Sequence, residues 1–286
     1  MSKGLIFAVL ASLFFSLMNV FAKYLSAHSI SIMEIAFYRG VIGVLITLMI
    51  IRIKKIELIV HNWPLLISRG LLGAISILFA FFTISKIALV EASFLAHLSP
   101  VITIFMAQAF LKEKLPKTAF IGITLAVIGA VFMTSPWNKN LRAIYVLIGI
   151  LGAFFTSSAS ISIRQLSKDH EKYLIILAFL LTSALLPIPF IKWSTYQLPD
   201  GSVLWSVIGI GIISFFGQYF LTLAYKHEKA ALVAATRYIG IVFSLFFGFF
   251  IWSEIPSASS TIGGGVIVLS CLLLTFPHWF FSQESK

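Results

Sequence analysis

The chain is a succession of long apolar runs separated by short polar breaks. Each run holds about twenty residues, enough for a helix that crosses a hydrocarbon core about 30 Å thick. The pattern therefore predicts ten membrane-spanning helices joined by short connections. Their predicted ranges are 4–25, 31–51, 64–84, 90–111, 118–135, 142–164, 172–191, 202–225, 230–252 and 259–281.

Composition favours a membrane protein over a soluble one. Hydrophobic residues make up 59% of the 286 residues and charged residues only 11%, with a mean hydropathy of +1.02. A soluble domain carries about a quarter charged residues. The first span follows Lys3 and resembles the apolar part of a signal peptide. Its run is longer than such a segment and further spans follow at once, so we expect it to be retained.

The basic residues of the loops predict the orientation. With the N-terminus in the cytoplasm, the inner side carries 13 of the 21 lysines and arginines and the outer side 5. The remaining three, Arg39, Arg69 and Arg237, lie within spans. The positive-inside rule then places both termini in the cytoplasm of a multi-pass protein of the inner (plasma) membrane. This topology also accounts for the net charge of +11, so we expect no nucleic acid partner.

A shift of 141 residues aligns the two halves of the chain. SLFFSLMNVFAKYL at 12–25 falls on AFFTSSASISIRQL at 153–166, and Glu113 falls on Glu254. We predict a five-helix repeat at 1–137 and a second at 138–286. Because five is odd, the two repeats enter the membrane in opposite directions, which is typical of transporters. The predicted fold is all-α, with ten transmembrane helices as two inverted repeats around a central cavity.

Two stretches carry a family resemblance: FFTISKIALVEASFLAHLSPVITIFMAQAFLKEK at 81–114 and AYKHEKAALVAATRYIGIVFSLFFGFFIWSE at 224–254. Both resemble the core of the EamA domain of the drug/metabolite transporter superfamily. The resemblance implies ten helices, with helices 1, 3, 4, 6, 8 and 9 around the cavity. The second copy has Ile241 where the first has Pro100, so the two fourth helices of the repeats need not bend alike.

Shorter motifs resemble the S-adenosylmethionine-transporter branch of that superfamily. They are MEIAFYRG at 33–40, SRGLLG at 68–73 and TRYIGIV at 236–242. This resemblance implies S-adenosylmethionine, or a related amino acid derivative, as the substrate.

Arg237 is the intramembrane charge that most indicates a binding site. It lies eight residues after Lys229, roughly 12 Å inside the nearer helix end. It could form a structural pair or cap the carbonyls of a broken helix. Alternatively it binds a substrate carboxylate, since a guanidinium grips a carboxylate in bidentate fashion. The deep parts of the spans hold three arginines and at most one carboxylate, Glu34, and the resemblance places Arg237 on a cavity helix.

The other two intramembrane arginines have simpler explanations. Arg69 is six residues after Trp63, so its side chain is expected to snorkel to the inner headgroups. Arg39 lies deeper, and Glu34 is the obvious candidate partner. Five residues of helix turn those two side chains about 140° apart, however, so they cannot easily pair. We expect a structural role for Glu34, and likewise for Glu113 and Glu254, which end corresponding spans.

His97 falls on Tyr238 under the 141-residue shift. A histidine at this depth could carry a coupling proton or bind a ligand, or it could be neutral and structural. Further polar residues could line the cavity or join helices to one another; they are Asn19, Gln108, Gln218, Tyr219 and Ser157. The predicted substrate-binding set is Arg237, Tyr238, His97, Asn19, Gln218, Tyr219, Ser157 and Arg39.

These features favour a secondary transporter of a small carboxylate-bearing or zwitterionic metabolite, such as an amino acid or S-adenosylmethionine. The chain has no GxxxxGK[ST] motif for nucleotide phosphates and no paired acids within a span, so neither an ATPase nor an intramembrane enzyme is expected. We expect no cofactor or metal; the partners are the bilayer, the substrate and a possible coupling proton. The alternatives are an exporter of organic cations or drugs and, less favoured, a channel.

Overall fold

The computed structural model describes residues 2–86, 92, 95–96, 98–113, 117–134, 143–193, 199–253 and 258–275. Within these ranges the chain is helical and contains no β-strand. A 3₁₀ turn, η2, covers Ile188–Phe190. The α-helices are α1 (Lys3–Ala27), α2 (Ile32–Lys54), α3 (Trp63–Lys86), α5 (Leu98–Leu111), α6 (Lys117–Thr134), α7 (Ala143–Leu166), α8 (Lys172–Leu185), α9 (Gly201–His227), α10 (Ala230–Thr236), α11 (Ile239–Trp252) and α12 (Ala258–Thr275).

Seven segments of the described chain are long and apolar enough to cross a membrane. They coincide with the first, second, third, sixth, seventh, eighth and ninth predicted spans. The fourth predicted span is described as α5 only from Leu98 onward, and the fifth and tenth correspond to α6 and α12, each 18 residues long. The protein is therefore an all-helical, multi-pass membrane protein, and the full number of ten spans stays a prediction.

The helix boundaries repeat along the chain. Adding 141 to the bounds of α5 gives those of α11, and adding 141 to those of α6 gives those of α12. Helix contacts repeat in the same way, since α1 packs on α9 as α7 packs on α3, and α5 packs on α7 as α11 packs on α1. The two halves thus contribute equivalent helices to one bundle.

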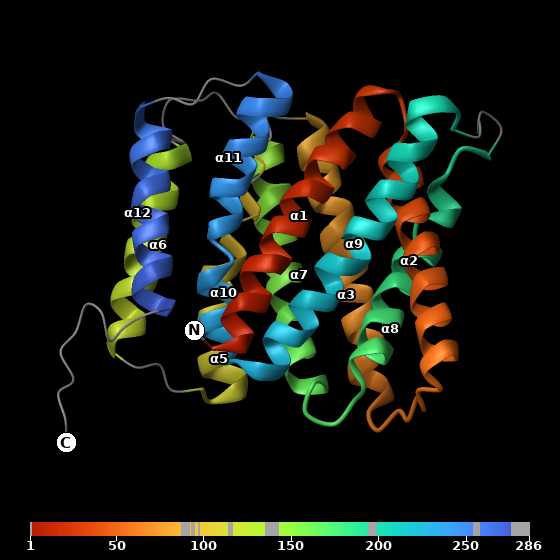
Figure 1. Ribbon diagram of the computed structural model, residues 1–286, viewed down its shortest axis with the longest axis horizontal. Coiled ribbons are helices and arrows are strands. Elements are labelled where there is room, and N and C mark those ends of the chain that lie inside the picture. Colours follow the sequence, from red (N-terminus) through yellow and green to blue (C-terminus); the bar gives the residue numbers. More distant parts are fainter. Residues whose placement is uncertain are drawn as a thin grey trace.

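Figure 1 shows how these helices are arranged. α6 and α12 lie side by side at one end of the molecule, and α2 and α8 lie at the other. α1, α7 and α9 run between them, with α10 and α11 beside α1. Helices from the two halves therefore alternate in the middle of the bundle, where a cavity between them is bounded by both halves.

Two local features fix the first helices. Ser2 caps α1 by accepting a hydrogen bond from the Leu5 amide. Ser31 and Glu34 form a reciprocal capping box at the start of α2, in which each side chain accepts from the other residue's backbone amide. This satisfies amides that a helix end leaves without partners, and it confirms the structural role predicted for Glu34.

A close approach of backbones joins the two halves at the α2–α8 contact. A Cβ placed on Gly40 would lie 2.5 Å from the Ala184 backbone nitrogen and 2.7 Å from its Cα. Only glycine lets the two helices come this near. Small residues serve this purpose in membranes because association there depends on close packing instead of the hydrophobic effect.

Candidate functional site

A cavity of about 130 Å³ lies between the central helices. It is bounded by α1, α3, α7, α8 and α9, by Ala96, and by the junction of α10 with α11. The family resemblance implies spans 1, 3, 4, 6, 8 and 9 around the cavity. These spans correspond to α1, α3, the span that contains Ala96, α7, α9, and α10 with α11. Phe179 of α8 lines the cavity in addition. The lining residues are Phe15, Met18, Asn19, Arg69, Gly73, Ser76, Ile77, Ala80, Ala96, Thr156, Ala159, Ser160, Ile163, Phe179, Gln218, Leu221 and Arg237.

Two smaller cavities adjoin this one. The first, about 60 Å³, shares Asn19, Ser76, Ala80, Ala96 and Thr156 with it. The second, about 80 Å³, shares Phe15, Asn19, Ala96 and Arg237. Asn19 and Ala96 therefore lie where all three cavities meet, and a role of Asn19 in substrate binding stays a prediction.

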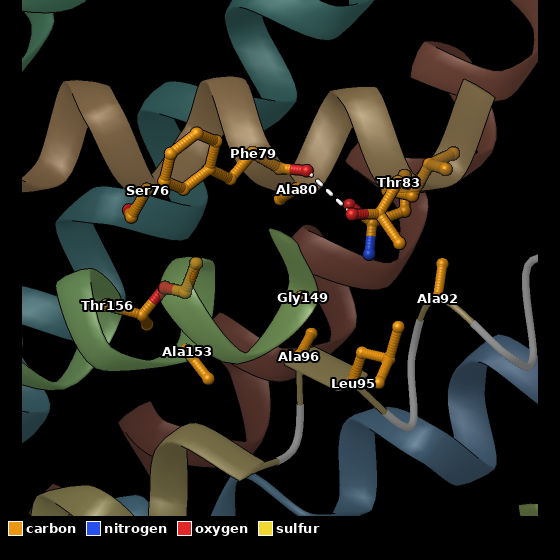
Figure 2. A pocket seen from close by; sticks show the side chains of 13 residues that line it. Ser76, Phe79, Ala80, Thr83, Ala92, Leu95, Ala96, Gly149, Ala153 and Thr156 are labelled. Atoms are coloured by element: carbon orange, nitrogen blue, oxygen red, sulfur yellow. Dashed lines mark hydrogen bonds between the residues drawn. The ribbon is translucent and has the colours of Figure 1, made fainter. Parts of the chain in front are cut away.

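The smaller of these compartments, drawn in Figure 2, is mostly apolar. Its hydroxyls are already used within their own helices: Thr83 donates to the Phe79 carbonyl, the bond dashed in Figure 2, and Thr156 donates to Gly152, both at 2.8 Å. The Phe79 ring, Leu95 and several alanines form the remaining wall. This part of the cavity suits an apolar portion of a ligand.

Arg237 lies at a turn within the ninth span. α10 ends at Thr236 and α11 begins at Ile239, with the turn held by a bond from the Gly240 amide to the Arg237 carbonyl at 2.9 Å. The Arg237 guanidinium lies over the ring of Phe15, 5.9 Å from its centroid. Arg237 lines both the 130 Å³ and the 80 Å³ cavities. The backbone at Arg237 and Tyr238 stays in the right-handed helical region, so the chain turns here without unwinding, and the Arg237 cation lies on the wall of both cavities.

Arg69 corrects a prediction made from the sequence. Snorkelling to headgroups is wrong, because Arg69 is only 2% exposed and lines the same cavity as Arg237. Its Nη2 donates to Gln218 Oε1 at 2.9 Å, and its guanidinium lies 4.5 Å from the Phe179 ring centroid. Distance from Trp63 along the sequence sets the depth of Arg69 but not the side of α3 from which it projects.

Gly73 makes room for Arg69 one turn further along α3. A Cβ there would collide with Arg69 Nη1 and would lie 2.5 Å from Cδ2 of Phe179. The glycine at i+4 is the sequence signal that could have indicated an arginine extended along its own helix toward the C-terminal end. Phe179, by contrast, is one apolar residue among many in its span, and no sequence pattern marks it.

Arg39 is fully buried but does not line these cavities. Its Nη1 donates to Ser183 Oγ at 2.8 Å, and its guanidinium lies 4.8 Å from the Phe179 centroid. Arg39 and Arg69 therefore contact the same aromatic ring. Nε and Nη2 of Arg39 and Nε of Arg69 have no hydrogen-bond partner. The structure places Arg39 next to the cavity wall, outside the set of lining residues.

The remaining candidates divide into two groups. Gln218 is 5% exposed and lines the cavity beside Arg69. Ser157, Tyr219 and Tyr238 do not line the cavities described above. Ser157 donates to the Ser99 and Ala153 carbonyls, both at 2.8 Å, and so joins α7 to α5.

Tyr219 packs against Tyr173 and Phe215, and Tyr238 is 1% exposed in a cluster with Ile241. Gln108 is exposed on the outside of α5. His97 and Glu254 lie outside the described residues. Among the residues that are described, no group of three or more His, Cys, Asp or Glu side chains could hold a metal ion.

Glu113 has a structural role in a place that the sequence did not indicate. Its Oε1 accepts from Arg164 Nε at 3.0 Å, and its Oε2 accepts from the Ala230 amide at 2.8 Å. Arg164 Nη1 also donates to the Tyr225 carbonyl at 2.8 Å. Glu113, for which a structural role is predicted, therefore connects the end of α5 to α7 and α10 of the other half.

Comparison with known proteins is consistent with this arrangement. The chain is 38% identical, over 276 residues and 96% of both chains, to the pseudopaline exporter CntI of Pseudomonas aeruginosa (strain UCBPP-PA14). It is 25% identical to a riboflavin transporter of Brucella anthropi, over 84% of this chain and 86% of that protein.

A crystal structure with 19% identity superposes with a TM-score of 0.82, covering 96% of this chain and 99% of its own, which shows the fold. The EamA-like transporter family model matches twice, at residues 2–135 and 143–276. That family and its named relatives are transporters and not enzymes. The chain belongs to the EamA-like transporter family.

Proposed function

We propose that this transporter carries a small carboxylate-bearing or zwitterionic metabolite across the inner membrane by alternating access. The observation that carries the proposal is the position of Arg237, at the turn between α10 and α11 and on the wall of two adjoining cavities. A guanidinium at such a place can bind a carboxylate through two parallel hydrogen bonds. Amino acids and S-adenosylmethionine, whose transporter branch the short motifs resemble, have such a carboxylate.

The charge of the cavity wall separates this function from its main alternative. Among the described residues, those that line the 130 Å³ cavity include two arginines and two amides, Asn19 and Gln218, and no aspartate or glutamate. The two arginines repel organic cations, and their guanidinium groups already lie over the Phe15 and Phe179 rings that could otherwise attract one. Export of cationic drugs is therefore disfavoured.

The repetition of helix boundaries and contacts supports the mechanism. We infer ten spans in two inverted repeats because equivalent helices from each half enclose the cavity. We assign both termini to the cytoplasm because most basic loop residues then lie on the inner side. Exchange of conformations between the halves would open the cavity to one side and then to the other. The relative that exports pseudopaline favours export, and we assign a coupling proton to His97.

Substitution of Arg237 tests the carboxylate assignment. Amino acids and S-adenosylmethionine, each paired with its carboxamide, are to be titrated into purified wild-type, Arg237→Lys and Arg237→Ala proteins. Lysine keeps the charge but loses the planar fork, so it should weaken binding of the acid at least about tenfold, which is roughly 1.4 kcal/mol. Arg237→Ala should weaken binding further, and mainly the binding of the acid and not that of its carboxamide.

Two outcomes would refute the assignment. Equal weakening of acid and amide would mean that Arg237 does not bind the carboxylate. Loss of a monodisperse protein in Arg237→Ala, with unchanged affinities in Arg237→Lys, would make the role of Arg237 structural.

A further inference from the structure

Two arginines occupy different walls of the central cavity. Arg69 projects from α3 and is held by Gln218 of α9 and the ring of Phe179 in α8. Arg237 projects from the α10–α11 junction. Arg237 also lines the adjoining 80 Å³ cavity, whereas Arg69 does not. The two cations therefore face one continuous space from separate positions.

The Arg69 side chain is buried and incompletely satisfied. It is 2% exposed, and its Nε has no hydrogen-bond partner. Gln218 accepts a hydrogen bond from one of the Arg69 N–H groups. Because Gln218 is neutral, it does not neutralise the positive charge of Arg69. Contact with an aromatic ring offsets only part of the cost of burying a cation, which is several kcal/mol. The nearby guanidinium of Arg39, which lies over the same ring, adds a second like charge.

We propose that Arg69 and Arg237 bind two separate carboxylate groups of one substrate, so that the carried molecule is a small dicarboxylate. This inference rests on the proposed function and makes its substrate class narrower. Arg237 holds one carboxylate, and Arg69, oriented by Gln218, holds the other. The apolar compartment around Phe79 and Leu95 receives the hydrocarbon part of the molecule.

Separate placement of the cations favours two anionic groups over a single compact one. An inorganic phosphate ion is compact and carries its charge at one position, whereas a dicarboxylate carries two carboxylates at separate positions. A dicarboxylate can reach both arginines, provided that the number of carbons between its carboxylates matches the gap. A preference for one chain length is therefore part of the expectation.

The test compares dicarboxylates with their monoamides, which keep the size and remove one charge. Succinate, glutarate, adipate, their monoamides and inorganic phosphate are titrated by calorimetry into the full chain in lipid nanodiscs. We expect one dicarboxylate to bind at least about tenfold more tightly than its monoamide and more tightly than phosphate. Absence of binding by all three dicarboxylates, equal binding of acid and monoamide, or tighter binding of phosphate overturns the proposal.

Variants then identify the second carboxylate site. Arg69→Gln and Arg69→Lys should each reduce the affinity for the dicarboxylate to about that for the monoamide, and Arg69→Lys keeps the charge if Arg69→Gln does not fold. Arg52→Gln, which removes a charge from the exposed end of α2, is the matched control and should leave the affinity ratio unchanged. If the ratio of the affinities for the dicarboxylate and its monoamide is unchanged in both Arg69 variants, the proposal is overturned.

The same measurements separate the two proposals. If the monoamide binds in a manner that depends on Arg237 and the Arg69 variants change nothing, a carrier of single carboxylates remains and the dicarboxylate inference fails. If Arg237→Lys leaves the affinities for all of these acids unchanged, the proposed function itself fails.

Discussion

Glu113 is predicted to hold the two halves of the transporter together through its charge. Its carboxylate bridges Arg164 Nε at 3.0 Å and the Ala230 amide at 2.8 Å. Ala230 begins α10, and the N-cap residue Lys229 makes no side-chain capping bond. Glu113 thus caps α10 from another helix, where a negative charge is also favoured by the helix dipole. We consider the substitution Glu113→Gln, which keeps the shape and removes the charge.

The structure sets the expected magnitude. The Arg164 and Glu113 side chains are 21% and 12% exposed, so the pair is neither fully screened nor fully buried. Arg164 donates to one carboxylate oxygen and the Ala230 amide to the other. In Glu113→Gln one of these oxygens becomes an NH2 group, which cannot accept, so one charge-assisted bond of about 1.5–3 kcal/mol is lost. We therefore expect Glu113→Gln to cost about 2 kcal/mol. At about 2–4 °C per kcal/mol, the apparent Tm should fall by about 4–8 °C.

The assay is thermal unfolding of the purified protein in detergent for Glu113→Gln, Arg164→Gln and the double variant. Because the two side chains interact directly, their effects should be non-additive, with a coupling of about 1 kcal/mol or more. Glu57→Gln, at an exposed position, is the matched control and should change the free energy of unfolding by less than about 0.5 kcal/mol. Additive single effects, or a Glu113→Gln shift no larger than the control, would refute this account.

Two further predictions concern packing and topology. Gly40→Ala should cost about 1–3 kcal/mol because the new methyl group meets the Ala184 backbone; Gly265→Ala, where nothing lies within 4 Å of the added Cβ, should be close to neutral in the same thermal assay. For the inverted repeats, reporters fused after Lys55 and after Lys172 should both be cytoplasmic. An external signal after Lys172 would contradict the inversion.

Hydropathy along the chain determined which segments enter the membrane. The third span was predicted at 64–84 and is found as Trp63–Lys86, and the eighth was predicted at 202–225 and is found as Gly201–His227. These agree because each long apolar run must bury its backbone polar groups in a helix when it is surrounded by lipid. The 141-residue repeat was equally visible, since it depends only on the order of spans and breaks.

What the sequence could not determine is the direction in which each polar side chain projects and which distant residue it meets. The ninth span reads as one continuous apolar run, yet in the structure a turn at Arg237 and Tyr238 divides it into α10 and α11, and packing on α1 supports that turn. Arg69 has the sequence of a snorkelling residue but is buried against Gln218, which lies 149 positions away. The depth of a side chain in the membrane follows from its position along the span. Whether that side chain faces the cavity depends on the rotation of its helix about the helix axis, and only the packing of neighbouring helices sets that rotation.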